Sequence, residues 1–385
     1  IIKIINMENF EIYNPVKAYF GKNVIQKLAQ EIKSRGKRIL LIYGKGSIKQ
    51  NGIYDAVMEQ ININGSEVFE YSGIKPNPLI EDVRAAVSLG KSKEVDLVLA
   101  VGGGSVIDSA KVTAIGIAGD ADPWEYVKGK ETPHGAVPLI AVLTLAATGT
   151  EMNCFAVVQD NATNEKIGFG YPPMYPAVSF LDPAYTISVS AEYTSFGITD
   201  LIAHALEAYF GNGDASLSDR FVFGIINEAL EYGPQLMNDL TNYDLRARIM
   251  YAATMALNNL TAYGRKSGDW GVHSIGHVLS VLYDVPHGAS LSIAYPAWLR
   301  LQKDKAGDRI IHMGKNLFGV SSVDETINAL EDYFTLIQSP VKLSQTAYGK
   351  YDQDLIIATF ASNRVGGMHH MISVSDHQKL LELMW

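Results

Sequence analysis

The sequence predicts an α/β domain with a largely parallel sheet, followed by an all-helical domain. Up to residue 182, short apolar β-like runs alternate with helical stretches, which is typical of a parallel sheet covered by helices. After Asp182-Pro183 the β-like runs stop and long helical segments continue. A chain of 385 residues also exceeds one ordinary hydrophobic core. We therefore place a domain boundary near residue 185, with domains over residues 1–185 and 186–385.

Five apolar runs bounded by glycine or polar residues are expected to be strands of the sheet. They are residues 38–43, 67–71, 96–101, 138–142 and 177–181. Helical segments are expected near residues 23–35, 52–63, 79–91 and 105–117. In the second domain, the expected helices cover residues 191–210, 218–232, 243–263 and 324–337.

Composition and charge argue against several classes of protein. The net charge is −9 and we find no basic patch, so a nucleic-acid partner is not expected. No apolar run approaches the roughly 20 residues that cross a bilayer, so no membrane partner is expected either. The single cysteine, Cys154, excludes an intrachain disulfide and fits a reducing, cytoplasmic location. Residues 1–6 are too short for a signal peptide, and Met7 is the expected natural start.

A glycine loop joins an expected strand to an expected helix. It reads Gly102-Gly103-Gly104-Ser105, and Asp108 follows in the helix. Glycines let the backbone approach a pyrophosphate, and a helix N-terminus offers unpaired N–H groups and positive potential. A tight turn needs glycines equally, and the loop lacks the usual G-x-G-x-x-G spacing. We expect these residues to contact the phosphates of a dinucleotide.

A second polar segment, from Leu143 to Glu151, follows the next expected strand. The hydroxyls of Thr144 and Thr148 are expected to line the ribose and nicotinamide end of the dinucleotide. Thr148 and Glu151 also have the spacing of a capping box, so the segment equally predicts a capped helix start. The two interpretations can hold together.

The turn after the first buried strand bears on the type of dinucleotide. In NAD-specific sites an acidic side chain commonly binds the ribose 2′-hydroxyl. Gly44 stands at that position here, with Lys45, Gly46, Ser47 and Lys49 nearby. Without a carboxylate to repel a 2′-phosphate, and with lysines to attract it, the turn predicts NADP(H) rather than NAD(H). The alternative is that these lysines are only solvated surface.

The second half of the chain carries a pattern typical of a metal site. Asp200 and His204 are four residues apart in an expected helix, so their side chains share one face. His273 and His277 repeat this spacing, and His287 follows in an expected turn. A carboxylate with imidazoles suits a borderline divalent metal, Fe²⁺ or Zn²⁺. The spacing alone leaves open whether His273 or His277 faces the metal.

Taken together, these blocks resemble the iron-containing (type III) alcohol dehydrogenases, and the likeness covers nearly the whole chain. The motifs that carry it include Phe20-Gly21-Lys22, Pro76-Asn77-Pro78, Gly102 to Ser105 with Asp108 and Lys111, Thr148-Gly149-Thr150-Glu151, Phe180-Leu181-Asp182-Pro183, Asp200 with His204, and the His273, His277 and His287 series. Tyr43 to Ser47, Asp122-Pro123-Trp124 and Gly268-Asp269-Trp270 are most similar to the NADPH-dependent butanol dehydrogenase and aldehyde reductase subgroup. Ala146, where many relatives have proline, and the atypical segment 369–385 depart from the pattern.

The resemblance implies a Rossmann-like dinucleotide domain followed by an all-helical metal domain, as in dehydroquinate synthase. It implies four metal ligands, Asp200, His204, His273 and His287. It places His277 beside the substrate, outside the usual ligand set. It assigns a cofactor contact to Lys166 and brings Asn153 and Leu181 into the same region.

The expected function is an NADP(H)-dependent alcohol dehydrogenase that also acts as an aldehyde reductase. The metal would bind the oxygen of a small alcohol or aldehyde, and hydride would pass directly between the substrate carbon and nicotinamide C4. His277 would relay the proton, unless it only shapes the pocket. The alternatives are a polyol dehydrogenase or a dehydroquinate-synthase-like lyase and, from another class, a non-catalytic nucleotide sensor with a structural metal. An edge strand near the N-terminus is expected to support a homodimer.

Overall fold

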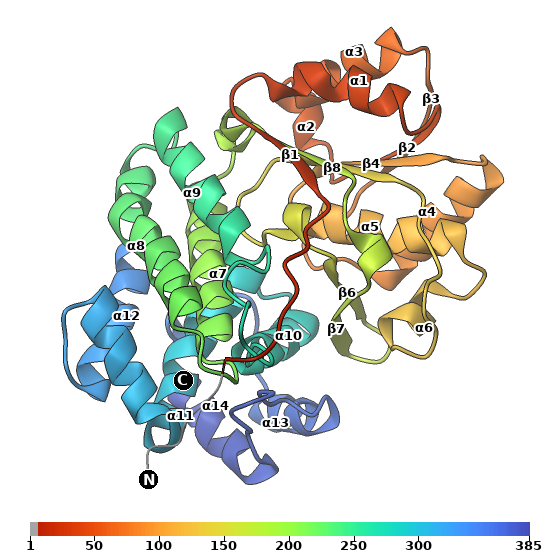
Figure 1. Cartoon of the computed structure of the whole chain (residues 1–385). Coiled ribbons are helices and arrows are strands. Elements are labelled where there is room, and N and C mark those ends of the chain that lie inside the picture. Colours follow the sequence, from red (N-terminus) through yellow and green to blue (C-terminus); the bar gives the residue numbers. More distant parts are fainter. Residues whose placement is uncertain (1–6) are drawn as a thin grey trace. The chain divides into compact units, whose positions relative to one another are not determined.

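The computed structural model describes residues 7–385, which form an α/β unit and a helical unit (Figure 1). The α/β unit comprises Asn14–Val189 and Thr241–Met250. The helical unit comprises Ser190–Leu240, Tyr251–Trp385 and the described residues up to Tyr13. The expected remnant at residues 1–6 lies outside the described residues. The parallel sheet of the first unit and the helices of the second confirm the predicted fold class.

The α/β unit is built on a six-stranded sheet in which each neighbouring pair of strands is parallel. Its order is β1-β8-β5-β4-β2-β3. The strands are β1 (Lys17–Phe20), β2 (Arg38–Tyr43), β3 (Glu67–Ser72), β4 (Leu97–Gly102), β5 (Leu139–Leu143) and β8 (Val178–Leu181). The chain runs from β2 outward to β3 and then returns to β4 on the other side of β2. This reversal brings the carboxyl ends of β2 and β4 together, where open α/β sheets bind their ligands.

Helices cover both faces of this sheet because its central strands are apolar on both sides (Figure 1). Alternate residues face opposite ways: Leu41 packs toward α1 and α3, whereas Leu40 packs toward α4 and α5. The helices are α1 (Leu28–Lys33), α3 (Ile53–Ile63), α4 (Ile80–Ser92) and α5 (Gly104–Ala118). Each fully buried leucine or isoleucine of this core stabilises the unit by about 1.5–3 kcal/mol.

A hairpin that the sequence did not reveal packs beside α4, α5 and the short helix α6 (Pro123–Val127). It consists of β6 (Phe155–Asp160) and β7 (Glu165–Gly170), paired antiparallel. Strand β7 contains only two large apolar residues among charged residues and glycines, so no apolar run marks it in the sequence. The hairpin matters for the site because β7 carries Lys166.

The helical unit is assembled around two central helices, α7 (Ala191–Tyr209) and α11 (His287–Leu317). Their neighbours are α8 (Ser216–Asn238), α10 (Gly271–Tyr283), α12 (Val323–Leu336) and α14 (His377–Met384), and α13 (Gln353–Ser362) packs on α10 and α14. Helix α7 is buried on all sides from Thr194 onward, which fixes its side chains in place. Its start is capped by the Ser190 hydroxyl, which accepts a hydrogen bond from the Tyr193 N–H.

Two expectations about helices need correction. The helix expected over residues 243–263 is α9 (Tyr243–Ala256), which ends seven residues early because turns built on Asn258 and Asn259 follow it. His287 was expected in a turn, but it is the first residue of α11, directly after Pro286. The ring of Pro286 fixes its own φ (−54°), its ψ of 139° is extended, and the helix begins at the next residue.

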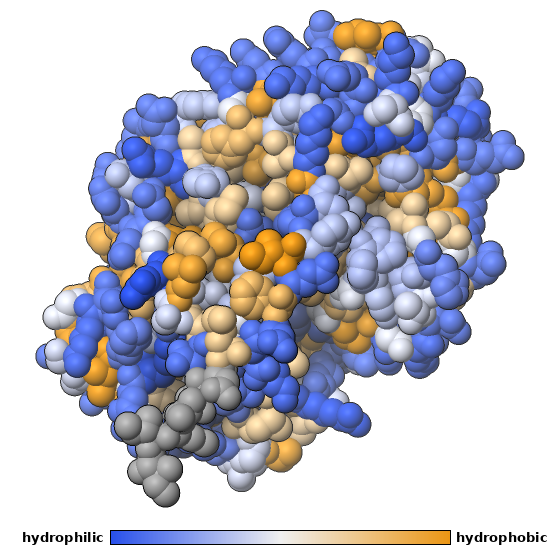
Figure 2. All heavy atoms as spheres, viewed as in Figure 1, coloured by the Kyte–Doolittle hydropathy of each residue, from blue (hydrophilic) through white to orange (hydrophobic). Residues whose placement is uncertain are grey.

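The surface over α1 to α3 is mainly hydrophilic on the face drawn in Figure 2. This agrees with the exposed polar residues on the outer sides of these helices. Within residues 7–385, no helix combines the length and apolar character needed to span a bilayer.

Candidate functional site

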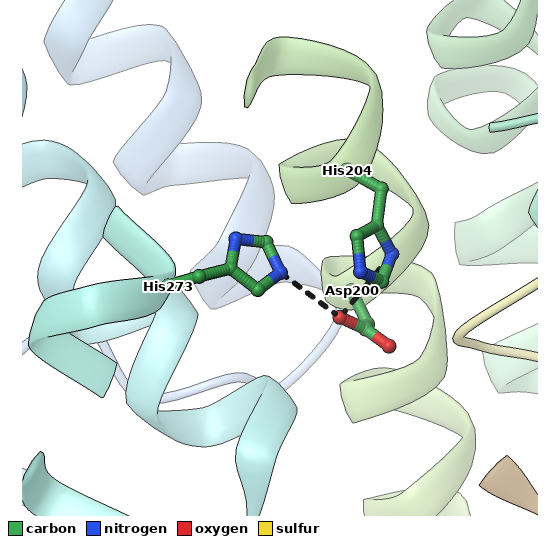
Figure 3. Close-up of side chains that lie close together, drawn as sticks. All are labelled: Asp200, His204 and His273. Carbon is green, nitrogen blue, oxygen red and sulfur yellow. Dashed lines mark ion pairs between the residues drawn. The ribbon is translucent and has the colours of Figure 1, made fainter. Parts of the chain in front are cut away.

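Three helices of the helical unit bring the predicted metal-site residues together. Asp200 and His204 lie one turn apart on α7 and are both buried. His273 lies on α10 and is also buried, while His287 begins α11 and is half-buried. Figure 3 shows the side chains of Asp200, His204 and His273 directed toward one another. The helical spacing read from the sequence therefore produces a cluster in space.

The Asp200 carboxylate oxygen Oδ1 is the common neighbour of three imidazoles. It lies 3.5 Å from His204 Nδ1, 3.9 Å from His273 Nε2 and 3.6 Å from His287 Nε2. A tetrahedral metal with bonds near 2.0–2.1 Å holds its ligand atoms roughly 3.4 Å apart. The observed separations therefore fit a shared divalent cation.

The charge state of the cluster also suits a metal. Burial, together with the neighbouring His273, holds the pKa of His204 well below its ordinary value, so this imidazole is neutral. Its buried Nδ1 has no hydrogen-bond partner among the described residues. A neutral imidazole with an available lone pair is the form that coordinates Zn²⁺ or Fe²⁺.

His273 Nε2 lies 3.9 Å from Asp200 Oδ1, whereas His277 contacts the cluster through the rings of His273 and His287. The two residues occupy successive turns of α10, and His277 is half-buried. The His277 ring centroid lies 6.4 Å from that of His273 and 5.7 Å from that of His287. The choice between His273 and His277, which the spacing left open, thus favours His273 beside Asp200, with His277 at the margin of the cluster.

Glu207 is a member of the site that the sequence did not reveal. It lies on α7, is buried, and accepts a hydrogen bond from the His273 ring at 2.9 Å. Burial raises the pKa of Glu207 to about 7, although backbone N–H donors, those of Trp270 and His273 among them, oppose the rise. The only sequence signal is a carboxylate three residues after His204, because its partner lies 66 residues later.

In the α/β unit, several of the predicted cofactor residues lie at the carboxyl ends of the parallel strands. The turn at Gly44 follows β2 and the loop at Gly102 ends β4, and the two strands are direct neighbours with Tyr43 opposite Val101. Thr144 follows β5 and donates its backbone N–H to the Gly102 carbonyl. Leu181 ends β8 at the same edge. This edge contains the switch point at which dinucleotides bind in such sheets.

The loop Gly102–Gly104 needs glycine because other groups pack closely against it. A Cβ on Gly104 would lie 2.6 Å from Thr148 Cγ2, and one on Gly103 would lie 3.1 Å from Leu145 Cβ. Helix α5 starts at Gly104, with Ser105 in its first turn. The N-terminus of this 15-residue helix therefore presents N–H groups and positive potential at the edge of the sheet.

Two predicted cofactor residues, Asp108 and Asn153, belong to a buried network. Asp108 accepts hydrogen bonds from Thr150 Oγ1 (2.6 Å) and from the Val157 N–H (2.9 Å). Lys111 donates its buried ammonium to Thr150 Oγ1, Asn153 Oδ1 and the Phe155 carbonyl. This network ties helix α5 to the segment before the hairpin, so these side chains brace the loop from within.

Burial shifts the pKa values of Asp108 and Lys111 in the directions that favour their neutral forms. The pKa of Asp108 is raised, and the pKa of Lys111 is lowered to about 8, with desolvation the largest cause in each case. Mutual attraction opposes both shifts. Hydrogen bonds to Thr150, Asn153 and the Phe155 carbonyl hold the two side chains in place.

The capping box expected from Thr148 and Glu151 is wrong. The segment forms a single 3₁₀ turn, Thr150–Met152, after Gly149 in a left-handed conformation (φ 60°). The Thr148 hydroxyl accepts from the Thr150 N–H instead of reaching the third residue of a helix. The positive φ at Gly149 turns the chain away from a regular helix start.

Two predicted cofactor lysines have protein partners. Lys166 donates from its buried ammonium to Asn77 Oδ1 at 2.8 Å. Lys49 lies over the rings of Tyr43 and Tyr54 and is 3.3 Å from the Glu70 carboxylate, with its pKa raised by these neighbours. Lys45 and Ser47 are exposed beside Gly44 and Gly46. Lys166, Lys49 and the rest of this residue set stay predictions as cofactor contacts.

A parallel sheet with glycine turns at its switch point, joined in one chain to a buried cluster of a carboxylate and imidazoles, is the combination expected of metal-dependent enzymes that bind a dinucleotide. Two family models match the chain. "Iron-containing alcohol dehydrogenase" matches residues 15–183, and "Fe-containing alcohol dehydrogenase family, C-terminal" matches residues 194–380. The chain belongs to the iron-containing alcohol dehydrogenase family, as the sequence motifs indicated.

Curated relatives and solved structures agree with this assignment. NADH-dependent butanol dehydrogenase A of Clostridium acetobutylicum is 36% identical over 386 residues, covering 98% of this chain and 99% of the relative. NADPH-dependent aldehyde reductase YqhD of Escherichia coli is 34% identical, covering 88% of this chain and 89% of the relative. The crystal structure of NADH-dependent butanol dehydrogenase A from Thermotoga maritima has a TM-score of 0.95 at 36% identity and covers 99% of both chains.

Proposed function

We propose that this protein is an NADP(H)-dependent alcohol dehydrogenase that interconverts small primary alcohols and aldehydes. The observation that carries the proposal is the convergence of three imidazoles on Asp200 Oδ1 within 4 Å. Asp200, His204, His273 and His287 would hold Fe²⁺ or Zn²⁺. A divalent cation held there supplies Lewis-acid chemistry toward the oxygen of an alcohol or aldehyde.

The protein's own residues would then bind and orient the reactants. Glycine turns at the carboxyl ends of β2 and β4 would cradle the dinucleotide, with the α5 N-terminus toward its phosphates. A bound nicotinamide cofactor would supply the hydride acceptor for alcohol oxidation, and the hydroxyl proton would leave for solvent. His277, half-buried at the margin of the cluster, would carry that proton through its imidazole.

The choice of NADP(H) rests on the turn after β2. Gly44 carries no carboxylate toward a 2′-phosphate, and Lys45 is exposed beside it. Lys49 contributes less than the sequence suggested, because Glu70 neutralises part of its charge. The relatives include both NADH-dependent and NADPH-dependent enzymes, so similarity alone does not select the cofactor. The proposal of NADP(H) is therefore argued from the turn at Gly44. A cytoplasmic homodimer is the form in which we expect the enzyme to work.

A direct assay tests the proposed reaction. The purified protein, loaded anaerobically with Fe²⁺ or with Zn²⁺, is mixed with butanal and NADPH or NADH, and absorbance of the reduced nicotinamide is followed. We expect oxidation of the cofactor with a higher kcat/KM for NADPH. Absence of oxidation with either cofactor, across a panel of small aldehydes and polyols, would contradict the proposal.

The Gly44→Asp variant tests the cofactor choice. A Cβ at Gly44 meets its nearest atom, the Ile74 carbonyl oxygen, at 3.5 Å, so the new side chain fits. Repulsion between the new carboxylate and a 2′-phosphate should lower kcat/KM for NADPH about tenfold or more, while NADH is little affected. Gly135→Asp is the matched control, because a Cβ there has open space and the same charge is added elsewhere. An unchanged NADPH-to-NADH ratio in Gly44→Asp would reject this reading of the turn.

A further inference from the structure

Glu207 connects two parts of the metal cluster that come from different helices. It follows Asp200 and His204 on the same face of α7, at the seventh position after Asp200. Its Oε1 accepts from His273 Nδ1 at 2.9 Å and from the His273 backbone N–H at 3.0 Å. Its Oε2 accepts from the Trp270 N–H at 2.5 Å. One carboxylate thus holds both the backbone and the ring of His273.

The contacts of Glu207 determine which ring nitrogen of His273 carries the proton. The backbone N–H groups at Glu207 can only donate, so its oxygens act as acceptors. These backbone donors favour the ionised carboxylate, and toward an ionised Glu207 the Nδ1 of His273 donates its proton to Oε1, which leaves the lone pair on Nε2. Nε2 is the atom that lies 3.9 Å from Asp200 Oδ1. The imidazole is held in the tautomer, and in the direction, that a cation at the cluster requires.

The same carboxylate also fixes where α10 begins. Trp270, at the N-cap, has a left-handed backbone (φ 63°), and its N–H is one that the helix itself cannot satisfy. Glu207 accepts this N–H and so places the first turn of α10, which carries His273, against α7. A carboxylate near a helix N-terminus is also favoured by the helix dipole.

We propose that Glu207 is a positioning residue of the metal centre, which fixes the orientation and tautomer of His273 and thereby raises the affinity of the cluster for a divalent cation. This inference rests on the proposed metal site at Asp200, His204, His273 and His287. A second carboxylate that orients a metal-binding imidazole typically contributes 10–100-fold in metal affinity.

Asp269 offers a matched control in the same region. It is fully buried, like Glu207, and burial raises its pKa to about 6. Its carboxylate accepts the backbone N–H groups of Gly271, His369 and His370, and among the described residues it accepts from no imidazole ring. Asp269→Asn therefore disturbs a buried carboxylate and its loop without removing a hydrogen bond to the ring of His273.

The experiment measures Co²⁺ binding to metal-depleted full-length protein, with a competing chelator and the Co²⁺ absorption bands as readouts. We expect Glu207→Gln, which keeps one acceptor oxygen, to bind Co²⁺ about 10-fold more weakly, and Glu207→Ala about 100-fold more weakly. Asp269→Asn should stay within twofold of the native affinity even if its melting temperature falls. In ¹⁵N-histidine NMR spectra, the native His273, assigned by its loss in His273→Ala, should show the Nδ1–H tautomer, and Glu207→Ala should lose this preference.

The outcomes separate this inference from the function on which it rests. If the native protein itself fails to bind Co²⁺, the proposed metal centre is wrong and the inference fails with it. If the native protein binds Co²⁺ and Glu207→Gln binds equally well, only the role of Glu207 is wrong. Equal losses in Glu207→Gln and Asp269→Asn would likewise overturn it, because a general effect on the fold would then explain both. Should Glu207→Ala not fold, Glu207→Gln and the native tautomer decide.

Discussion

The two units build their candidate sites from different parts of the chain. In the helical unit, the site consists of side chains on α7, α10 and α11, and each is fixed by the packing of its helix. In the α/β unit, the site consists mainly of backbone at the carboxyl ends of strands, and nearby polar side chains brace it. A side-chain site should fail when one functional group is removed, whereas a backbone site should fail when a group is added.

The largest effect is expected from deleting a ligand of the side-chain site. His273→Ala should empty the metal centre and lower kcat by roughly 10³-fold, equivalent to about 4 kcal/mol of transition-state stabilisation. NADPH affinity should stay within twofold, because the residues predicted to bind the cofactor belong to the other unit. Elemental analysis, kinetics and fluorescence titration of NADPH measure the three quantities.

His277→Ala is the matched comparison, one helical turn away on α10. It should retain most of the metal while lowering turnover about 10²-fold and changing its pH profile. Loss of metal in His277→Ala, with metal retained in His273→Ala, would reverse the ligand assignment.

Much of this difference between the units could be predicted from the sequence, because periodicity and spacing are local. The run Arg38–Tyr43 forms a strand with the predicted bounds, since its residues are apolar enough to be buried on both faces. Asp200 and His204 meet because four residues make about one helical turn. The same spacing could not choose between His273 and His277, because the angle at which α10 meets α7 depends on contacts distant in the sequence.

The remaining features depend on contacts between residues far apart in the sequence. Glu207 is part of the site because it contacts His273, which lies 66 residues later. Its only local sequence signal is its position three residues after His204. The cofactor contacts of Asp108 and Asn153 stay predictions, and the hydrogen bonds of these residues join helix α5 to the segment 149–157. A polar residue next to a ligand loop has the same local sequence whether it binds the ligand or braces the loop.

A smaller effect is expected from adding a methyl group to the backbone site. Gly104→Ala should place a Cβ 2.6 Å from Thr148 Cγ2 and push the two loops apart. We expect NADPH affinity to fall about 10- to 100-fold, or about 1.4–2.7 kcal/mol, with Co²⁺ affinity unchanged. Gly135→Ala, where a Cβ has open space, is the control. If Gly104→Ala binds NADPH normally, the loop does not carry the phosphates.

The units also differ in how they hold a buried carboxylate. Asp108 in the α/β unit is attracted by the charges of Lys111 and Lys166, but its hydrogen bonds come from Thr150 and the Val157 N–H, and desolvation raises its pKa. Burial also acts to raise the pKa of Asp219 in the helical unit. Asp219, however, accepts hydrogen bonds from the guanidinium groups of Arg309 and Arg265. Although desolvation is the largest contribution, the hydrogen bonds and charges of these arginines together lower its pKa. Direct hydrogen bonds from two guanidinium groups therefore reverse the direction of the pKa shift that burial alone imposes.

This reversal predicts a dependence of stability on pH. Because the pKa of Asp219 is lower in the folded than in the unfolded protein, the unfolded protein binds more protons between the two values. The stabilisation is fully present above the ordinary pKa near 4 and is lost as pH falls through the lowered value. Asp219→Asn should therefore destabilise the helical unit by about 2 kcal/mol at pH 7, and the difference from the native protein should shrink in acid.

Urea unfolding between pH 3 and pH 7, followed by circular dichroism, measures this dependence. The matched control is Asp308→Asn, an exposed carboxylate on α11 beside Arg309. Its stability should follow that of the native protein within about 0.5 kcal/mol at each pH, because surface substitutions rarely exceed this. Parallel curves for the native protein and Asp219→Asn would mean that the arginines do not stabilise the ionised carboxylate. The contrast with Asp108 would then reduce to burial alone, and the two units would hold their buried acids in the same way.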